Sequence, residues 1–432
     1  MSFNLRAIRT AVFVLMPLAS LSAIGASRIA HCAIPIARSE LPRETAVEAS
    51  PDDLPTLVAG NTEFAIDAYG LLGNQYKGHN LFFSPYSISM ALSMAYAGAR
   101  GKTADEMARA MRFLLPRERL HRAFGVLDAQ VSSRSADGVV LQAANSMWAR
   151  EKTHFEKPFL DTLAQSYGAG VRLVNFAGDP EGSRKRINAW VADQTRDQIR
   201  ELLRAGAVDG STVLMLTNAV YFRGDWLRRF EPDHTAPRVF SRLDGSAAKV
   251  STMHAPMWGA GLSQSAAFDA VELRYRGGNV AMDIVMPRAG SFAAFESGLT
   301  GASLEAILKG LNAEQFELFV PKFKLKGASG GVKEVLRALG MDLAFDPQEA
   351  DFSGVTSDSV APLFLREVIH SATVTVDEKG TEAAAATAFD GVRAGRPLPI
   401  EIRIDHPFFF FIRDVPTGAI LFAGRVTDPT EG

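Results

Sequence analysis

This chain does not place its histidines at the spacings that metal-based catalysis requires. It has eight histidines, but none forms a His-Glu-x-x-His pair or another pattern with metal-ligand spacing. Gly98 to Thr103 resembles the end of a phosphate-binding loop, yet the motif requires a glycine where Tyr96 stands. We therefore expect no metal and no other cofactor, and we expect that the protein is not an enzyme. A catalytic triad assembled from distant residues is the open alternative.

The stretch from Val374 to Ala388 carries the strongest indication of function. It begins as a strand, and Gly380 provides a flexible pivot. The run that follows is dominated by small side chains, and its residues are Thr381, Glu382, Ala383, Ala384, Ala385, Ala386 and Thr387. A polar loop containing Gly and Arg comes next and is closed by Pro397 and Pro399.

As a strand, this run would have two different faces. The residues of one face are Thr381, Ala383, Ala385 and Thr387, and those of the other are Glu382, Ala384, Ala386 and Ala388. The first face has only small side chains, so it could slide between existing strands, while the charged face meets water. Alanine has a poor strand propensity, but low bulk is what a late-inserted strand requires. On composition alone, a mobile linker or a helix fits the run equally well.

The rest of the chain supplies helices first. The spacing of apolar residues predicts helices over 56–72, 87–97, 103–111 and 184–203. In the third of these, Thr103 is a candidate cap with Glu106 at the capping-box spacing.

Strand patterns follow later in the chain. The candidates are Val139–Trp148, Val213–Phe222, Ala281–Met286, Phe316–Leu325, Ala372–Val376 and Phe408–Ile412. Around Phe323, apolar residues alternate with lysines, and the four phenylalanines from Phe408 indicate a strand that is buried on both faces. His254 and His370 lie in strand contexts, where hydrogen-bonded core histidines are expected. Because the elements follow no regular βαβ repeat, we expect an α+β fold with antiparallel sheets.

The run from Glu378 to Thr387 resembles the reactive-loop hinge of inhibitory serpins. Other blocks match the family in the expected order between Leu57 and about Pro429, and these are Asn80–Ile88, Asn145–Trp148, Thr217–Trp226, Val320–Lys324 and His406–Phe410. The resemblance implies the α+β serpin fold, with mixed, mainly antiparallel β-sheets, about eight or nine helices and an exposed reactive-centre loop.

The resemblance also implies roles for individual residues. Four residues, Ser84, Ser87, Asn218 and His370, would form the shutter, a polar cluster beneath the sheet whose strands separate to admit the loop. Glu378 and Trp226 would lie in the breach, where insertion of the loop begins. The implied activity is suicide inhibition, in which a protease cleaves the loop and becomes acyl-linked to it. The loop then inserts as a new strand, and roughly 15 residues at ~3.3 Å each would carry the protease ~50 Å.

The identity of the reactive bond stays open between two neighbours. The usual spacing of the family, counted forward from Glu378, places Ala394 before the cleaved bond and Gly395 after it. A small residue there suits an elastase-like or subtilisin-like protease, whereas cleavage after Arg393 suits a trypsin-like protease. Counting backward from His406 points instead to Arg396, where the following proline makes a poor substrate. Arg393 and Ala394 are therefore both retained.

The first residues have the pattern of a secretory signal. Arg6 and Arg9 precede an apolar stretch that ends in small residues near Ala26. Pro17 and the shortness of this stretch argue against an uncleaved membrane anchor. We expect a signal peptide at 1–26, an N-terminal tail at 27–54 and the serpin domain at 55–432. The mature protein would be secreted to the extracellular space, or to the periplasm in a bacterium.

Composition limits the partners. The net charge is −2, which favours neither a nucleic acid nor a membrane surface as a partner. Cys32 is the only cysteine, so an internal disulfide is excluded and the residue is interpreted as incidental. The expected partner of a monomeric inhibitor is a serine protease, with a cysteine protease as the alternative target. The runner-up function is that of a non-inhibitory serpin, a carrier or substrate, although such members usually have bulky, charged or proline residues in the hinge.

Overall fold

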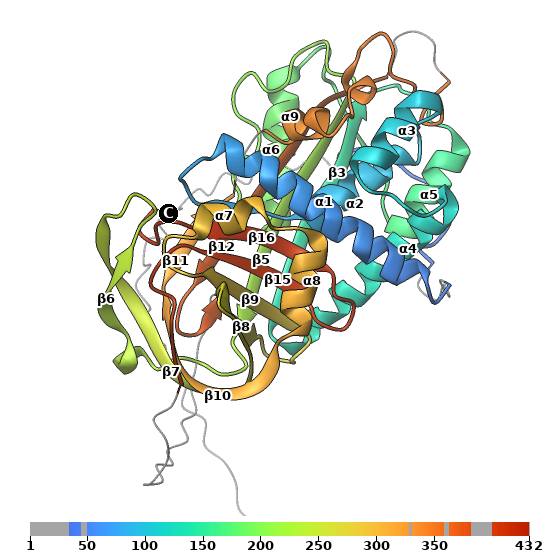
Figure 1. The fold of residues 1–432 in the computed structure, drawn as a ribbon. Helices are drawn as coiled ribbons and strands as arrows, with labels where there is room; N and C mark the ends of the chain where they lie inside the picture. Colours follow the sequence, from blue (N-terminus) through green and yellow to red (C-terminus); the bar gives the residue numbers. More distant parts are fainter. Residues whose placement is uncertain (1–33, 45–49, 328–330, 358–362, 382–399, 432) are drawn as a thin grey trace, which may run out of the picture. The chain divides into compact units, whose positions relative to one another are not determined.

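The computed structural model describes residues 34–44, 50–327, 331–357, 363–381 and 400–431 (Figure 1). The chain divides into a short unit, residues 1–34, and a compact unit, residues 35–432, to which all elements below belong. The predicted signal peptide at 1–26 and Cys32 lie outside the described residues.

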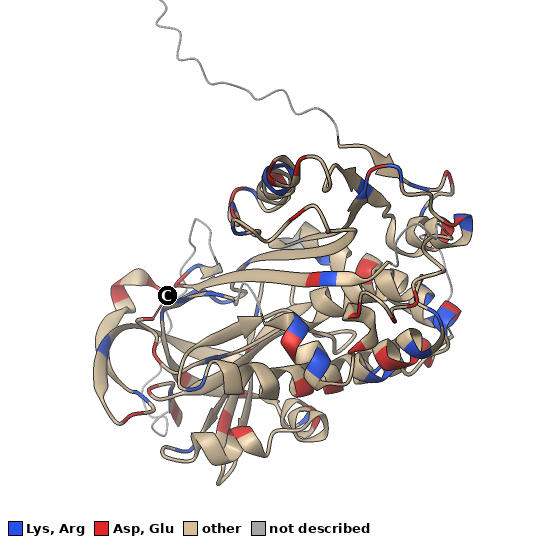
Figure 2. Ribbon diagram, turned by 90° about the horizontal axis from the view of Figure 1, so that it is seen from above, with Lys and Arg blue, Asp and Glu red and all other residues tan. Residues whose placement is uncertain are grey.

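Nine α-helices occur in the described part of the compact unit. They are α1 (Asp53–Gln75), α2 (Pro85–Tyr96), α3 (Gly101–Ala110), α4 (Arg117–Ser133), α5 (Lys157–Tyr167), α6 (Pro180–Gln194), α7 (Phe292–Ser297), α8 (Gly301–Lys309) and α9 (Val332–Ala338). Basic and acidic residues are interspersed along these helices (Figure 2). Short 3-10 helices are η1 (Arg134–Asp137), η2 (Pro232–His234) and η3 (Leu343–Phe345).

The strands form two sheets. The seven-stranded sheet contains, in spatial order, β1 (Ile36–Ala37), β4 (Val171–Val174), β3 (Val139–Arg150), β5 (Leu214–Asp225), β12 (Leu365–Val376) and β11 (Phe323–Lys326), with β13 (Gly380–Thr381) paired to β5. The nine-stranded sheet contains β14 (Ile400–Arg403), β10 (Asn312–Pro321), β7 (Ala247–Gln264), β8 (Phe268–Arg274), β9 (Val280–Pro287), β15 (Phe408–Asp414), β16 (Ile420–Val426) and β2 (Leu81–Phe83), with β6 (Ala236–Ser241) paired to β7. Three pairs are parallel, β3–β4, β5–β12 and β10–β14, and the others are antiparallel. The expected α+β fold with mainly antiparallel sheets is confirmed.

Helix α2 is the central element of the core. All of its residues are buried, and it packs against β3 and β5 of one sheet and β16 of the other. Its start is fixed by local chemistry, because the Ser84 hydroxyl caps the Ser87 amide and Pro85 occupies the first helical position. The phenylalanines of β15, Phe408 to Phe411, are fully buried, as predicted.

Two helix predictions need correction. α3 begins at Gly101, so Thr103 lies inside the helix, where its hydroxyl accepts from the Asp351 amide. Glu106 likewise accepts amides from a distant segment rather than closing a capping box. α6 begins at Pro180, capped by Asp179, and ends at Gln194 instead of running to Leu203. It ends early because Arg196 and Asp197, with φ of 50° and 62°, leave the right-handed helical region.

The predicted strand Phe316–Leu325 is two strands in different sheets. β10 ends at Pro321, which has no amide hydrogen to donate, and β11 begins at Phe323 in the other sheet. Lys322 lies at the crossing point between the sheets. The predicted alternation holds in β11, where Phe323 and Leu325 are buried and the lysines between and after them are exposed.

The segment predicted to be an N-terminal tail contributes to the sheet. Ile36–Ala37 forms β1 and pairs with β4, and Ser39 and Arg43 bind Asp161 and Asp128 at 2.6 Å each. α1 begins at Asp53, just before the expected domain boundary.

Candidate functional site

The pairing between the parallel strands β5 and β12 stops partway along the sheet. The register runs from Leu365 opposite Leu214 to Thr373 opposite Tyr221. Both strands continue, to Val376 and Asp225, but the described residues contain no further pair between them. A hollow of ≈ 60 Å³ opens here and is lined by Gln198, Tyr221, Phe222, Lys324, Lys326, Thr373 and Thr375. The seven-stranded sheet is therefore closed at one end of this strand pair and open at the other.

The chain leaves β12 through a tight turn and returns to β5 at this open end. Gly380 pairs with Asp225, and Thr381 pairs with Gly224, both antiparallel. Gly380 has φ of 139°, and a Cβ built on it would lie 2.1 Å from the Gly224 carbonyl oxygen. Only glycine fits this close approach without strain, so the backbone explains why the pivot predicted here is Gly380.

Glu378 and Trp226 hold this turn in place. Lys322 Nζ lies 2.7 Å from Glu378 Oε2, and the Thr235 hydroxyl donates to Oε1 at 2.8 Å. Burial opposes ionisation of Glu378, but these hydrogen bonds outweigh it and hold the pKa below its usual value. Trp226 donates from Nε1 to the Asp377 carbonyl at 2.9 Å and stacks on Tyr275 with centroids 4.5 Å apart. The two residues predicted for the breach thus contact the same turn.

The four residues predicted for the shutter form one buried hydrogen-bonded cluster. Asn218 of β5 lies opposite His370 of β12, and its Oδ1 contacts His370 Nδ1. The Ser84 amide donates to His370 Nε2 at 3.0 Å. Asn218 Nδ2 donates to the Ser87 carbonyl at 2.6 Å. This cluster joins α2 to the two strands that border the open end.

The protonation state of His370 follows from this geometry. Nε2 accepts from a backbone amide, so the proton lies on Nδ1, which donates to Asn218 Oδ1. Burial lowers the pKa of His370 to about 3, so the ring is neutral at pH 7.

Asn145 belongs to the same cluster and was not predicted. Its Oδ1 accepts from Asn218 Nδ2 at 2.5 Å and from the Ser87 hydroxyl at 3.0 Å. The available signal was a polar residue within the apolar strand Val139–Trp148. The cross-strand register, Asn145 opposite Asn218, could not be read from the sequence.

The remaining predicted residues lie outside the described part of the chain. This holds for the hinge from Glu382 to Thr387 and for the reactive-bond candidates Arg393, Ala394 and Gly395. The segment that contains them has one described anchor in each sheet. It starts after Thr381 on β5 and ends at Ile400, which pairs with Phe316 of β10.

Other histidine and serine positions bear on alternative chemistry. His254, predicted to be a hydrogen-bonded core histidine, binds Glu317 at 2.7 Å but is only partly buried. Within the described ranges, no three His, Cys, Asp or Glu residues are placed to hold a metal ion, and no helix is long and apolar enough to cross a membrane. Gly327 to Gly331 has the Gly-x-Ser-x-Gly spacing of a nucleophile elbow, but its Ser329 lies outside the described residues.

The comparisons with known proteins agree on one family. The model of the family Serpin (serine protease inhibitor) matches residues 59–429. Human serpin B8 is 36% identical over 86% of this chain and 99% of its own length. The leukocyte elastase inhibitor of Sus scrofa is 35% identical over 86% of this chain and 99% of its own length. The crystal structure of tengpin, a thermophilic serpin in the native state, superposes with a TM-score of 0.80 at 25% identity, covering 91% of this chain and all of that one.

Proposed function

This chain belongs to the serpin family, and from that premise we propose that it is a secreted inhibitor that traps a serine protease by inserting its own cleaved loop. The family is one of protease inhibitors rather than enzymes, and its members include elastase inhibitors. The observation that carries the proposal is the open end between β5 and β12, with Gly380 and Thr381 already paired to β5 beside it.

The register of these two residues indicates how the loop would continue. If the loop continues along β5 in this register, Thr387 would lie opposite Asn218, and Gly391 would lie opposite Leu214, the first residue of β5. Residues opposite each other in a pair point to the same side of a sheet. Thr381, Ala383, Ala385 and Thr387 would therefore share a side with Phe222, Val220 and Asn218, which are fully buried. Only small side chains could enter there without displacing α2 and the core around it.

The same register supports the position of the reactive bond. A protease attached at Arg393 or Ala394 would be carried just past Leu214, to the opposite end of β5 from the turn. To reach that point, the pairs from Thr373–Tyr221 to Leu365–Leu214 must separate in turn. The contacts between Asn218 and His370 must break on the way.

The covalent step is an interrupted acyl transfer. The serine hydroxyl of the target attacks the carbonyl of Arg393 or Ala394, an ester forms, and the peptide bond to the next residue breaks. The new amino terminus takes a proton and leaves. Insertion then removes the ester from its aligned geometry before water hydrolyses it, so inhibition depends on a race between two rates.

The first test is complex formation on a denaturing gel. The mature protein, without residues 1–26, is mixed with trypsin and separately with elastase. We expect a band near the summed mass that withstands denaturant. Trapping of trypsin would assign the bond after Arg393, and trapping of elastase alone would assign the bond after Ala394. Cleavage in the loop without such a band, for either protease, would favour the non-inhibitory function, and turnover of small esters would favour a hydrolase.

A matched pair of variants tests insertion itself. In the inserted strand, Thr381→Arg would place a charge on the side shared with Phe222 and Val220, so it should convert the inhibitor into a substrate that is cleaved without trapping. Glu382→Arg places the same charge on the opposite side, level with the half-exposed Arg223, and should still trap. Undiminished trapping by Thr381→Arg would contradict the insertion model.

A further inference from the structure

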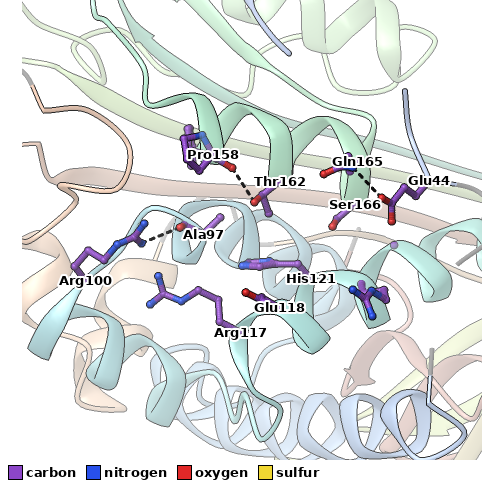
Figure 3. A pocket seen from close by; sticks show the side chains of 13 residues that line it. Glu44, Ala97, Arg100, Arg117, Glu118, His121, Pro158, Thr162, Gln165 and Ser166 are labelled. Carbon is purple, nitrogen blue, oxygen red and sulfur yellow. Dashed lines mark hydrogen bonds between the residues drawn. The ribbon is translucent and has the colours of Figure 1, made fainter. Parts of the chain in front are cut away.

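A second cleft of ≈ 290 Å³ lies among helices and shares no lining residue with the site described above. Its lining comes from the turn between α2 and α3, from α4 and α5, and from Glu44 in the segment before α1 (Figure 3). Three arginines, Arg100, Arg117 and Arg122, line it together with His121.

Two of these arginines are fixed next to each other. Arg100 and Arg117 both donate to the Ala99 carbonyl, at 2.8 Å and 2.7 Å. Arg117 also lies over the ring of Tyr96, 4.6 Å from its centroid. In the described part of the chain, neither arginine forms an ion pair with a carboxylate. Burial and then the charge of Arg117 lower the pKa of Arg100, an effect that Asp351 opposes. Two partly buried cations therefore face the same space without a bound counter-charge.

His121 adds a donor at the floor of the cleft. The residue is 4% exposed, its Nδ1 lies 2.7 Å from the Tyr167 hydroxyl, and its Nε2 is buried without a hydrogen-bond partner. Burial lowers the pKa of His121 to about 3 and raises that of Tyr167, so both are neutral and Tyr167 keeps its proton. The protonated Tyr167 hydroxyl can donate to Nδ1, and in that arrangement the ring proton lies on Nε2. A buried N–H without an acceptor is costly, and it points to a group that would complete the site.

We propose that this cleft binds a small oxyanion, a single phosphate or sulfate group. Arg100 and Arg117 would supply charge-assisted hydrogen bonds, and His121 Nε2 would donate the third. Two carboxylates lie at the edge and oppose binding. Glu44 accepts from Gln165 Nε2 at 2.8 Å, and both Glu44 and Glu118 are exposed, so water screens their charge more than that of the arginines. The proposal does not depend on the proposed function.

Titration calorimetry with inorganic phosphate, and separately with sulfate, tests the site at constant ionic strength set with chloride. We expect saturable binding of one anion per chain. Arg100→Gln and Arg117→Gln should each weaken it by about 10-fold or more, the usual effect of one charged hydrogen bond. Arg200→Gln, on the exposed loop after α6, removes the same charge elsewhere and should leave the affinity unchanged.

Two further arms keep the test decisive. If an arginine variant fails to fold, histidine ring NMR of the wild type still applies, because phosphate should shift the one resonance lost in His121→Gln. A sulfated polymer, dextran sulfate, distinguishes the cleft from a general surface field. The proposal is overturned if phosphate does not bind saturably, or if Arg200→Gln weakens phosphate binding as much as Arg100→Gln and Arg117→Gln do. It is also overturned if phosphate does not bind and the polymer still binds the double variant Arg100→Gln/Arg117→Gln.

Discussion

Replacing Asn218 with alanine should weaken the closed sheet at its centre. The side chain is fully buried and binds β3, β12 and α2 at once. The substitution removes two donor contacts from Nδ2, worth about 1 kcal/mol each, and leaves the His370 Nδ1 proton without an acceptor, which costs a further ~1–3 kcal/mol. We expect the free energy of unfolding of the native form to fall by about 3–5 kcal/mol.

The effect on insertion should be separable from the effect on stability. Asn188 is also buried, and its side chain binds the backbone of Leu203 at 2.8 and 2.9 Å, so these hydrogen bonds involve neither β5 nor β12. Asn188→Ala should therefore lower stability without changing loop insertion. Asn218→Ala should do both, because Asn218 joins the two strands that must separate.

Two measurements check this. Urea unfolding, followed by circular dichroism, gives the loss of stability for each variant. Incubation of uncleaved protein at mild temperature, with residual trapping activity as the readout, gives the rate of spontaneous insertion. We expect this rate to rise for Asn218→Ala and to stay near the wild-type rate for Asn188→Ala. Equal rates for the two variants, or a loss of stability below ~0.5 kcal/mol for Asn218→Ala, would refute the role assigned to the cluster.

Three further predictions concern the turn and the response to acid. Gly380→Ala forces a Cβ against the Gly224 carbonyl, so it should lower the free energy of unfolding by about 1–3 kcal/mol. It should also raise the fraction of inhibitor molecules that are cleaved without trapping a protease, which a titration of the inhibition stoichiometry measures. Glu378→Lys places a second cation beside Lys322, so it should lower the free energy of unfolding, measured in urea, by about 1–2 kcal/mol. The loss should exceed that of Glu378→Gln, and equal losses of stability in the two variants would argue against the ion pair. The folded pKa of His370, about 3, lies below its unfolded value, about 6.5, so unfolding takes up a proton and stability should fall as pH drops through that window. His370→Gln should flatten this fall, and an unchanged slope between pH 7 and pH 5 would contradict the assignment.

The sequence predicted the parts of this molecule that rest on short-range chemistry. The Ser84-Pro85 start of α2, the buried phenylalanines of β15 and the glycine at the turn each follow from one residue and its immediate neighbours. The four predicted members of the cluster around Asn218 came from the family resemblance, because Asn218 is 131 positions from Ser87 and 152 from His370 and no periodicity connects them.

What the sequence did not predict depends on long-range partners. Phe316–Leu325 has a single alternating pattern, and only the pairing of each half with a different strand shows that it crosses between sheets. Thr103 and Glu106 have the spacing of a cap, but distant amides compete for both side chains. Ile36–Ala37 is too short to be recognised as a strand without the exposed edge of β4 beside it.

The parallel pairing of β5 with β12 has an energetic consequence for the direction of insertion. A strand that continues from Thr381 is antiparallel to β5, and therefore antiparallel to β12 as well. Each step replaces one parallel ladder, which already contains a register shift between Leu365 and Val368, by two antiparallel ladders. Antiparallel ladders are slightly more stable per residue than parallel ones, and their number doubles. Under the proposed mechanism, the change in strand pairing would therefore favour continued insertion once the contacts of Asn218 with His370 have broken. A bound protease, once displaced from the turn, would be carried to the far end without any outside source of energy.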